Sequence, residues 1–285
     1  MSRQTVPSAV VRAAARQARV TLVRKYTSVA GISGGAFSLV SLVVLWFVRD
    51  MNFGDGMASA AGWIFAGFLG FGVVAAAVLG VAGELQTERE DGTLLRAKAV
   101  PHGMAGHLLA KLIVLPVDTL VPLLPVVVGA VLILPGTMPT EPLRWLLLVV
   151  VFLLTLAAML PWGAILGAIF RSMIGLAWSM MAIYVVAIAS GLFFPVTVMP
   201  TWTQWLVQAS PLYWIGRAFR GVLLPDSAAV AEIGGQWSLG LTSGVLLAWA
   251  VVGMLIAPVL LRRMARRQSG STVAAARERV LSRGY

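Results

Sequence analysis

The chain has 285 residues, of which 59% are hydrophobic and 12% are charged, about half the charged fraction of a typical soluble domain. Its mean hydropathy is +0.89 and it contains no cysteine. This composition excludes a soluble globular domain, a disulfide framework and a thiolate metal site, and it indicates an integral membrane protein.

Six apolar stretches are each long enough to cross a hydrocarbon core about 30 Å thick. They cover approximately residues 28–48, 60–83, 108–134, 143–170, 173–195 and 238–261. The third and fourth are longer than a straight crossing needs, so we expect them to tilt or kink. No repeat or low-complexity linker divides the sequence. Residues 1–285 therefore predict one all-α membrane domain with six transmembrane helices.

The net charge of +11 is unevenly distributed around these stretches. Most basic residues lie before the first stretch, between the second and third, and after the last. The predicted layout leaves four basic residues for the opposite side of the membrane: Arg49, Arg144, Arg217 and Arg220. The positive-inside rule then predicts that both termini are cytoplasmic. Anionic lipid is the expected contact of the basic segments, and no nucleic-acid partner is expected.

Residues 8–25 carry basic side chains at helical spacing before the first apolar stretch. Arg12, Arg16 and Arg19 recur at positions i, i+4 and i+7, with small and apolar residues largely on other faces. This pattern predicts a helix that lies in the plane of the lipid headgroups. A frayed basic tail is the alternative.

Segment 84–101 interrupts the apolar pattern and holds four of the eleven acidic residues. We expect a helix end that runs to Asp91 and stops at Gly92, which readily adopts a left-handed conformation. Thr93 then caps a second short helix, which Pro101 closes. A short helix that a membrane protein presents to water predicts a docking site for another protein.

Asp118 is the only acidic residue well inside an apolar stretch. A lone aspartate near the middle of a membrane costs about 2.5–3.5 kcal/mol on insertion scales, so it is expected to face the protein interior or a water-filled cavity. Pro122, four residues later, crowds the Asp118 carbonyl and predicts a kink. Asp118 is then either a cation or proton site on a transport path, or a carboxylate satisfied locally by Thr119, by Lys111 or by the loosened backbone.

Residues 191–215 are apolar, but three prolines and a glycine divide them into pieces too short to span a membrane. Non-helical backbone at membrane depth survives only where it is buried in protein or lines a cavity. We therefore expect a re-entrant hairpin on the outer side, with one short helix that breaks at Pro195 and another from about Thr201 to Ala209. An interfacial loop is the alternative.

Glycines and alanines recur at four-residue spacing in several stretches, which is typical of close helix packing in lipid. Whether these pairs pack within one chain or between two copies is open from the sequence. The pairs are Gly31/Gly35, Ala66/Gly70, Gly163/Gly167 and Gly240/Gly244.

The sequence offers little for catalysis. It contains no G-x-x-x-x-G-K-[ST] motif for a nucleoside triphosphate. His102 and His107, five residues apart, share no helix face well enough to bind a metal. We therefore expect neither enzymatic activity nor a cofactor in this chain.

Two motifs and the layout of the stretches resemble the type-2 ATP-binding-cassette (ABC) exporter permeases, including daunorubicin-resistance-like drug exporters. The first motif is the acidic run from Glu88 through Gly92-Thr93-Leu94 to Pro101. The second begins with Ser190-Gly-Leu-Phe-Phe-Pro195 and continues through Pro200-x-Trp202 to Pro211-Leu212. The third feature is the six-stretch layout with both ends inside.

This resemblance implies that segment 84–101 is a coupling helix seated in a separate ATPase subunit, and that residues 8–25 form an interfacial connecting helix. The coupling residues would be Glu84, Glu88, Arg89, Glu90, Asp91, Gly92, Thr93, Leu94 and Pro101. The re-entrant helices would close the outer gate, with Gly191, Phe194, Pro195, Pro200, Trp202 and Pro211 as its residues.

The expected function is that of a permease subunit, in the cell membrane, which exports an amphipathic or hydrophobic compound. ATP and Mg²⁺ would bind to the partner ATPase, and a second permease copy would complete a homodimer. Rival hypotheses are an ion-coupled secondary carrier that uses Asp118 and a non-transporting membrane scaffold. The residues expected to line the substrate path are Asp118, Phe68, Phe71, Trp162, Met180, Met181 and Phe193.

Overall fold

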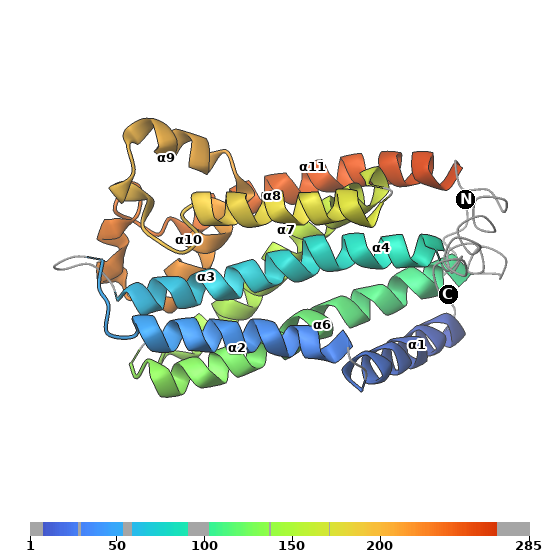
Figure 1. Ribbon diagram of the computed structural model, residues 1–285, viewed down its shortest axis with the longest axis horizontal. Coiled ribbons are helices and arrows are strands. Elements are labelled where there is room, and N and C mark those ends of the chain that lie inside the picture. The colour runs from blue at the N-terminus through green and yellow to red at the C-terminus, as the bar shows by residue number, and fades with distance from the viewer. Residues whose placement is uncertain are drawn as a thin grey trace.

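The apolar stretches form a bundle of helices that run along the long axis of the molecule (Figure 1). The structure is a computed structural model that describes residues 8–27, 30–53, 59–90, 103–136, 138–170 and 172–266. Within these ranges the regular elements are helices, apart from an isolated bridge between Asn52 and Ser59. The predicted all-α fold is confirmed.

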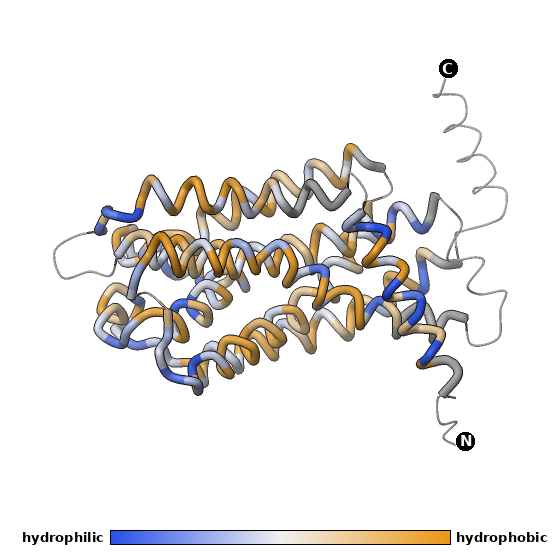
Figure 2. Tube along the Cα trace, turned by 90° about the horizontal axis from the view of Figure 1, so that it is seen from below, coloured by the Kyte–Doolittle hydropathy of each residue, from blue (hydrophilic) through white to orange (hydrophobic). Residues whose placement is uncertain are grey.

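The helices of the bundle are α2 (Ala30–Val48), α3 (Ala60–Val74), α4 (Val81–Glu90), α6 (Gly103–Ile133), α7 (Pro142–Ile169), α8 (Met173–Ala189) and α11 (Leu239–Arg266). Helix α1 (Ser8–Tyr26) lies at one end and packs against α6. At the other end lie α9 (Thr201–Gln208) and α10 (Pro211–Leu223), with 3₁₀ turns at Val196–Val198 and Asp226–Ala231. Hydrophobic residues dominate the middle of the bundle, and hydrophilic residues gather towards its ends (Figure 2).

Four helices of the described residues are long and apolar enough to cross a membrane: Ala60–Glu88, Ile113–Ile133, Pro142–Ile169 and Leu239–Met264. The first and fifth predicted stretches correspond to shorter apolar helices, Gly35–Val48 and Ile174–Ala189. The fifth stretch was expected to reach residue 195, but α8 ends at Ala189. Its end is followed by Gly191, whose φ of 69° does not continue a right-handed helix.

Helices α3 and α4 are joined by a π-helical segment, Ala75–Gly80, which the sequence analysis did not predict. Helix α7 approaches this segment closely at Gly163, where an added Cβ would collide with the carbonyl oxygen of Ala77. One turn later Gly167 lies against Ala82. This small-residue pair therefore packs within the chain. Gly240 and Gly244 differ, because an added Cβ at either would meet nothing within 4 Å.

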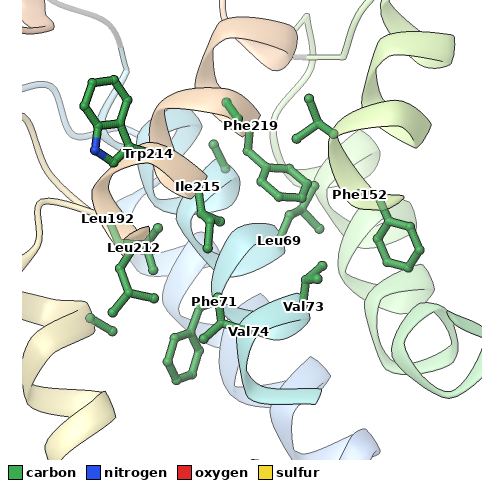
Figure 3. Close-up of a cluster of buried hydrophobic side chains, with 14 of the residues drawn as sticks. Leu69, Phe71, Val73, Val74, Phe152, Leu192, Leu212, Trp214, Ile215 and Phe219 are labelled. Atoms are coloured by element: carbon green, nitrogen blue, oxygen red, sulfur yellow. The ribbon is translucent and has the colours of Figure 1, made fainter. Parts of the chain in front are cut away.

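Helix α10 is the most deeply buried element at its end of the bundle. It packs against α3, α7 and α11. Its Ile215 and Phe219 project towards Leu69 of α3 (Figure 3), and both lie against Gly70. Because lipid is as apolar as these side chains, close van der Waals packing holds the contact together. The hydrophobic core thus fixes α10 against the spanning helices.

The approach of α7 to the π-helical segment gives a stability prediction. Gly163→Ala should destabilise the protein by about 1–3 kcal/mol, because the new methyl group meets backbone that cannot rotate away. Thermal unfolding of the purified protein in non-ionic detergent measures the effect. Gly83→Ala is the matched control, because an added Cβ there would meet nothing within 4 Å, and we expect it to unfold no earlier than the wild type. Equal melting of the two variants would contradict the packing described for Gly163.

Candidate functional site

A cavity of about 410 Å³ lies where the end of α1 meets the bundle. Its lining comes from α1, α2, the α3–α4 helix, α6 and α8. The polar residues of this lining are Lys25, Tyr26, Asp118 and Tyr184. The remaining lining residues are apolar: Phe37, Phe71, Gly72, Ala75, Ala76, Leu79, Gly80, Pro122, Leu123 and Met180.

Asp118 holds two side chains from the end of α1. Lys25 Nζ lies 2.6 Å from its Oδ2, and the Tyr26 hydroxyl donates to its Oδ1 at 2.9 Å. The local partners considered for Asp118 are wrong, since the Thr119 hydroxyl donates to the Leu115 carbonyl and Lys111 binds two glutamates of α4. The observed partners were not expected because they are more than ninety residues away in the sequence.

The depth of Asp118 explains how α1 reaches it. Asp118 lies five residues after Ile113, where the Ile113–Ile133 span begins. At 1.5 Å per helical residue this is roughly 7.5 Å along α6. Asp118 therefore lies nearer the α1 end of the span than its middle. The Tyr26 hydroxyl also lies 3.3 Å from the Asp118 carbonyl oxygen, the group that Pro122 leaves without a helical N–H donor. Burial, then the charge of Asp118, raises the pKa of Tyr26, so its phenol remains a hydrogen-bond donor.

The π-helical segment forms part of the cavity wall. Ala75, Ala76, Leu79 and Gly80 contribute to the lining, and an added Cβ at Gly80 would meet nothing within 4 Å. Small side chains on this wall leave the cavity open. Single-turn π-helices inside α-helices are frequent at functional sites because they displace side chains from the regular helical register.

Five of the seven residues expected on the substrate path come together. Asp118, Phe71 and Met180 line the cavity. The Phe193 ring packs against two others: its centroid lies 6.1 Å from that of Phe71 and 5.5 Å from that of Phe68. Phe68 precedes Phe71 by about one turn of α3, and Phe193 lies in the connection that follows α8.

The other two expected path residues lie elsewhere. Trp162 packs against Trp249 of α11, with ring centroids 5.0 Å apart. The Met181 side chain points away from the cavity lining and is 58% exposed. Adjacent residues of one helix face different directions, which explains why Met180 and Met181 are separated.

The residues predicted to couple to an ATPase begin at the end of α4. Lys111 of α6 lies 3.3 Å from Glu84 and 2.9 Å from Glu88, so two of these acids are held within the chain. Arg89 and Glu90 complete α4. The remaining members of the set lie outside the described residues: Asp91, Gly92, Thr93, Leu94 and Pro101. The start of the predicted coupling segment is thus anchored to α6.

The predicted gate residues lie in the connection from α8 to α10. Gly191 has φ 69° and is buried, and Phe194 is half-buried. Pro195 precedes a 3₁₀ turn rather than ending a helix, so the predicted helix that breaks at Pro195 is absent from residues 190–195. The helix expected from about Thr201 is α9, and Trp202 on it is 69% exposed. Pro200 caps α9 and Pro211 begins α10.

A buried ion pair behind these residues was missed by the sequence analysis. Arg220 Nη2 lies 2.8 Å from Glu232 Oε2, and both side chains are fully buried. Tyr213 donates to the other oxygen of Glu232, and Arg220 donates to the carbonyls of Gly191 and Leu192. Arg220 also lies 4.4 Å from the centre of the Trp63 ring. The pair therefore ties α10 to α3 and to both neighbouring loops.

Arg217 adds a second set of bonds one turn earlier. It donates to the carbonyls of Trp237, Gln236 and Ile233. The sequence analysis counted Arg217 and Arg220 among the basic residues of the opposite membrane face; the structure places both on α10, where they are buried. The available signal was the spacing of Tyr213, Arg217 and Arg220 at i, i+4 and i+7, which places three polar groups on one face of an apolar helix.

Comparison with known proteins places the chain in a family. A model of the family described as ABC-2 type transporter matches residues 15–224, about three quarters of the chain. The match contains every residue that lines the cavity and ends immediately after α10. A comparison with curated proteins gave no match.

The buried ion pair gives a second stability prediction. Glu232→Gln should destabilise the protein by about 3–5 kcal/mol, because it leaves the Arg220 charge buried without a counter-charge. The midpoint of thermal unfolding in detergent measures this loss. Asp226→Asn is the control, because that carboxylate lies in the same region and is 83% exposed. A Glu232→Gln protein as stable as the control would show that the pair does not hold this end together.

Proposed function

This chain belongs to the ABC-2 type transporter family, and we propose that it is the permease subunit of an exporter driven by a separate ATPase subunit. Members of the family are ABC transporter permeases and normally work with such a subunit. The observation that carries the proposal is the family match over residues 15–224, which includes the acidic segment between α4 and α6. ATP and Mg²⁺ would bind to the partner, and this chain would convert its motion into transport.

The ion pairs of Lys111 support a mechanical role for the acidic segment. The segment connects α4 to α6, and Lys111 holds these two helices together at that junction through Glu84 and Glu88. A push on residues 91–101 would therefore move α4 and α6 together rather than bend one of them. Helix α6 carries Asp118, and α4 continues into the π-helical wall, so this movement would reach the cavity.

The chemistry of the cavity supports an amphipathic or hydrophobic cargo. Its wall is mostly apolar and aromatic, with one ion pair at the α1 side. Such a lining favours a drug-like, antibiotic or lipid-like compound with a large apolar body over a sugar or a free nucleotide. The volume of about 410 Å³ is within the range of small-molecule sites.

The outer faces of the bundle support a homodimer in the cell membrane. Gly35, Gly240 and Gly244 face open space in the single chain, which suits close contact with a second copy. The excess of basic residues in the segments before α2, between α4 and α6 and after α11 supports cytoplasmic termini. Anionic lipids would contact these basic segments.

The mechanical proposal predicts that changes in the acidic segment uncouple transport. Glu90→Ala and Gly92→Pro should each lower ATP-driven transport by about 5- to 150-fold, the usual range of coupling between two sites. Vesicles containing permease and ATPase, loaded with a panel of hydrophobic dyes of different charge, measure vanadate-sensitive efflux. Amounts of permease in the membrane should stay the same.

Asp50→Ala is the control. Asp50 is an acidic residue that is 86% exposed, and it lies just after α2 ends at Val48, outside the acidic segment. Full transport by Glu90→Ala and Gly92→Pro would refute the coupling role. Dye movement that needs no nucleotide would instead identify an ion-coupled carrier. Purification without an ATPase, and with no transport, would favour the scaffold hypothesis.

A further inference from the structure

The cavity has an asymmetric distribution of charge and apolar surface. Asp118 and Lys25 form an ion pair in one part of the lining, and the rings of Phe71 and Tyr184 lie 5.1 Å apart in another. Met180 lines the same space and adds a polarisable apolar group. A ligand that fills this cavity would therefore meet one charged site and one aromatic surface.

The two partners of the ion pair differ in how firmly they are held. The Asp118 side chain is 12% exposed, belongs to the spanning helix α6 and accepts a second hydrogen bond from Tyr26. The Lys25 side chain is 36% exposed and lies at the end of α1 on a long flexible stem. The ammonium is thus the more exposed and more flexible member of the pair and the one that another cation can replace, whereas the carboxylate stays in place.

We propose that the cavity binds an organic cation with an apolar body, and that the cationic group replaces Lys25 at Asp118. The apolar body then lies against Phe71, Tyr184 and Met180; the two rings also attract a cation, and the thioether packs well against aromatic groups. This inference rests on the proposed transport function and specifies its cargo: an ammonium or other organic cation, carried by a soluble amphiphile or by a lipid.

The exchange would also signal that the cavity is occupied. Lys25 and Tyr26 together join the end of α1 to α6, so displacement of Lys25 removes one of the two side-chain contacts at Asp118. The end of α1 then becomes less tightly held, and Lys25 becomes more accessible to solvent. Cargo binding and the position of α1 are linked in this way without any change in covalent structure.

Two probes of similar size and opposite charge test the charge selectivity. Tetraphenylphosphonium is the cation and tetraphenylborate is the anion. Equilibrium dialysis with the purified full-length chain in dodecyl maltoside, without ATP or ATPase, gives the affinity of each. Comparison of each variant with the wild type in the same detergent removes the contribution of probe bound to micelles.

Asp118→Asn should lower the affinity for tetraphenylphosphonium by about fivefold or more, because the probe, which has no N–H to donate, loses its charge attraction to the carboxylate. Lys25→Met should raise it by up to about fivefold, because it removes the competing cation. Asp226→Asn, outside the cavity, should bind like the wild type. Unchanged binding by Asp118→Asn would overturn the proposal, and so would a cation affinity that falls in Lys25→Met. Because Lys25→Met retains the carboxylate, this second test remains informative if Asp118→Asn does not fold.

Labelling of Lys25 by an amine-reactive acetylating reagent tests the exchange itself. Tetraphenylphosphonium should increase acetylation of Lys25 relative to Lys111, which stays paired with Glu84 and Glu88. No increase at saturating probe would refute the replacement of Lys25. Competition by short-chain phosphatidylethanolamine would assign the cation to a lipid, and its absence would assign it to a soluble amphiphile; both outcomes support a cationic ligand.

The binding measurements and the efflux assay test the cationic cargo and the permease function separately. If the cation does not bind, but nucleotide-driven dye efflux persists and depends on Gly92, the permease function stands and the cargo assignment fails. If the cation binds as described, but no nucleotide drives its movement, the cavity assignment stands and the transport proposal fails.

Discussion

The pairing of buried and half-buried charges between different elements organises this protein. A charged group removed from water is costly unless a partner of opposite charge and further hydrogen bonds replace the lost hydration. Among the described residues, three pairings in which neither side chain is mostly exposed connect different helices or loops: Arg220 with Glu232, Lys25 with Asp118, and Lys111 with Glu84 and Glu88. Each holds two segments at one defined position, because hydrogen-bonded charges have a preferred direction of contact that apolar side chains lack.

The three pairings differ in burial, and this difference assigns them different mechanical roles. Arg220 and Glu232 are fully buried and bonded on several sides, so the α10 end of the bundle behaves as one rigid unit. Lys111 and its glutamates are partly exposed and hold α4 to α6 where the acidic segment begins. The pair of Lys25 and Asp118 is also partly exposed, and it lies at the cavity. Movement at one end can thus reach the cavity while the other end stays fixed.

The sequence predicts the helices well because hydropathy and helix length are local properties. It also singles out Asp118 as a candidate site residue, because an acidic residue is unusual within an apolar stretch. It does not reveal that Lys25 and Tyr26 bind Asp118, because that contact depends on how α1 folds back against α6. The π-helical segment is equally hidden: Ala75–Gly80 is composed of ordinary helix-compatible residues, and its hydrogen-bond pattern depends on packing against α7.

The small-residue pairs also show that sequence spacing alone does not determine what a helix face packs against. Spacing alone makes Gly163/Gly167 and Gly240/Gly244 equivalent, but only the first pair meets backbone of its own chain. The open pair remains available for lipid or a second copy.

Two departures from regular α-helix meet at the cavity, and together they explain why it is there. In α6, Pro122 removes an N–H donor, and the carbonyl of Asp118 turns to Tyr26 of α1. In the α3–α4 helix, the π-helical segment contributes small side chains to the cavity wall. Each departure weakens the straight ladder of backbone hydrogen bonds at the same level of the bundle. The helices are therefore easiest to bend beside Asp118, so a force applied through α4 and α6 would change the shape of the cavity before it disturbed the packed core around α10.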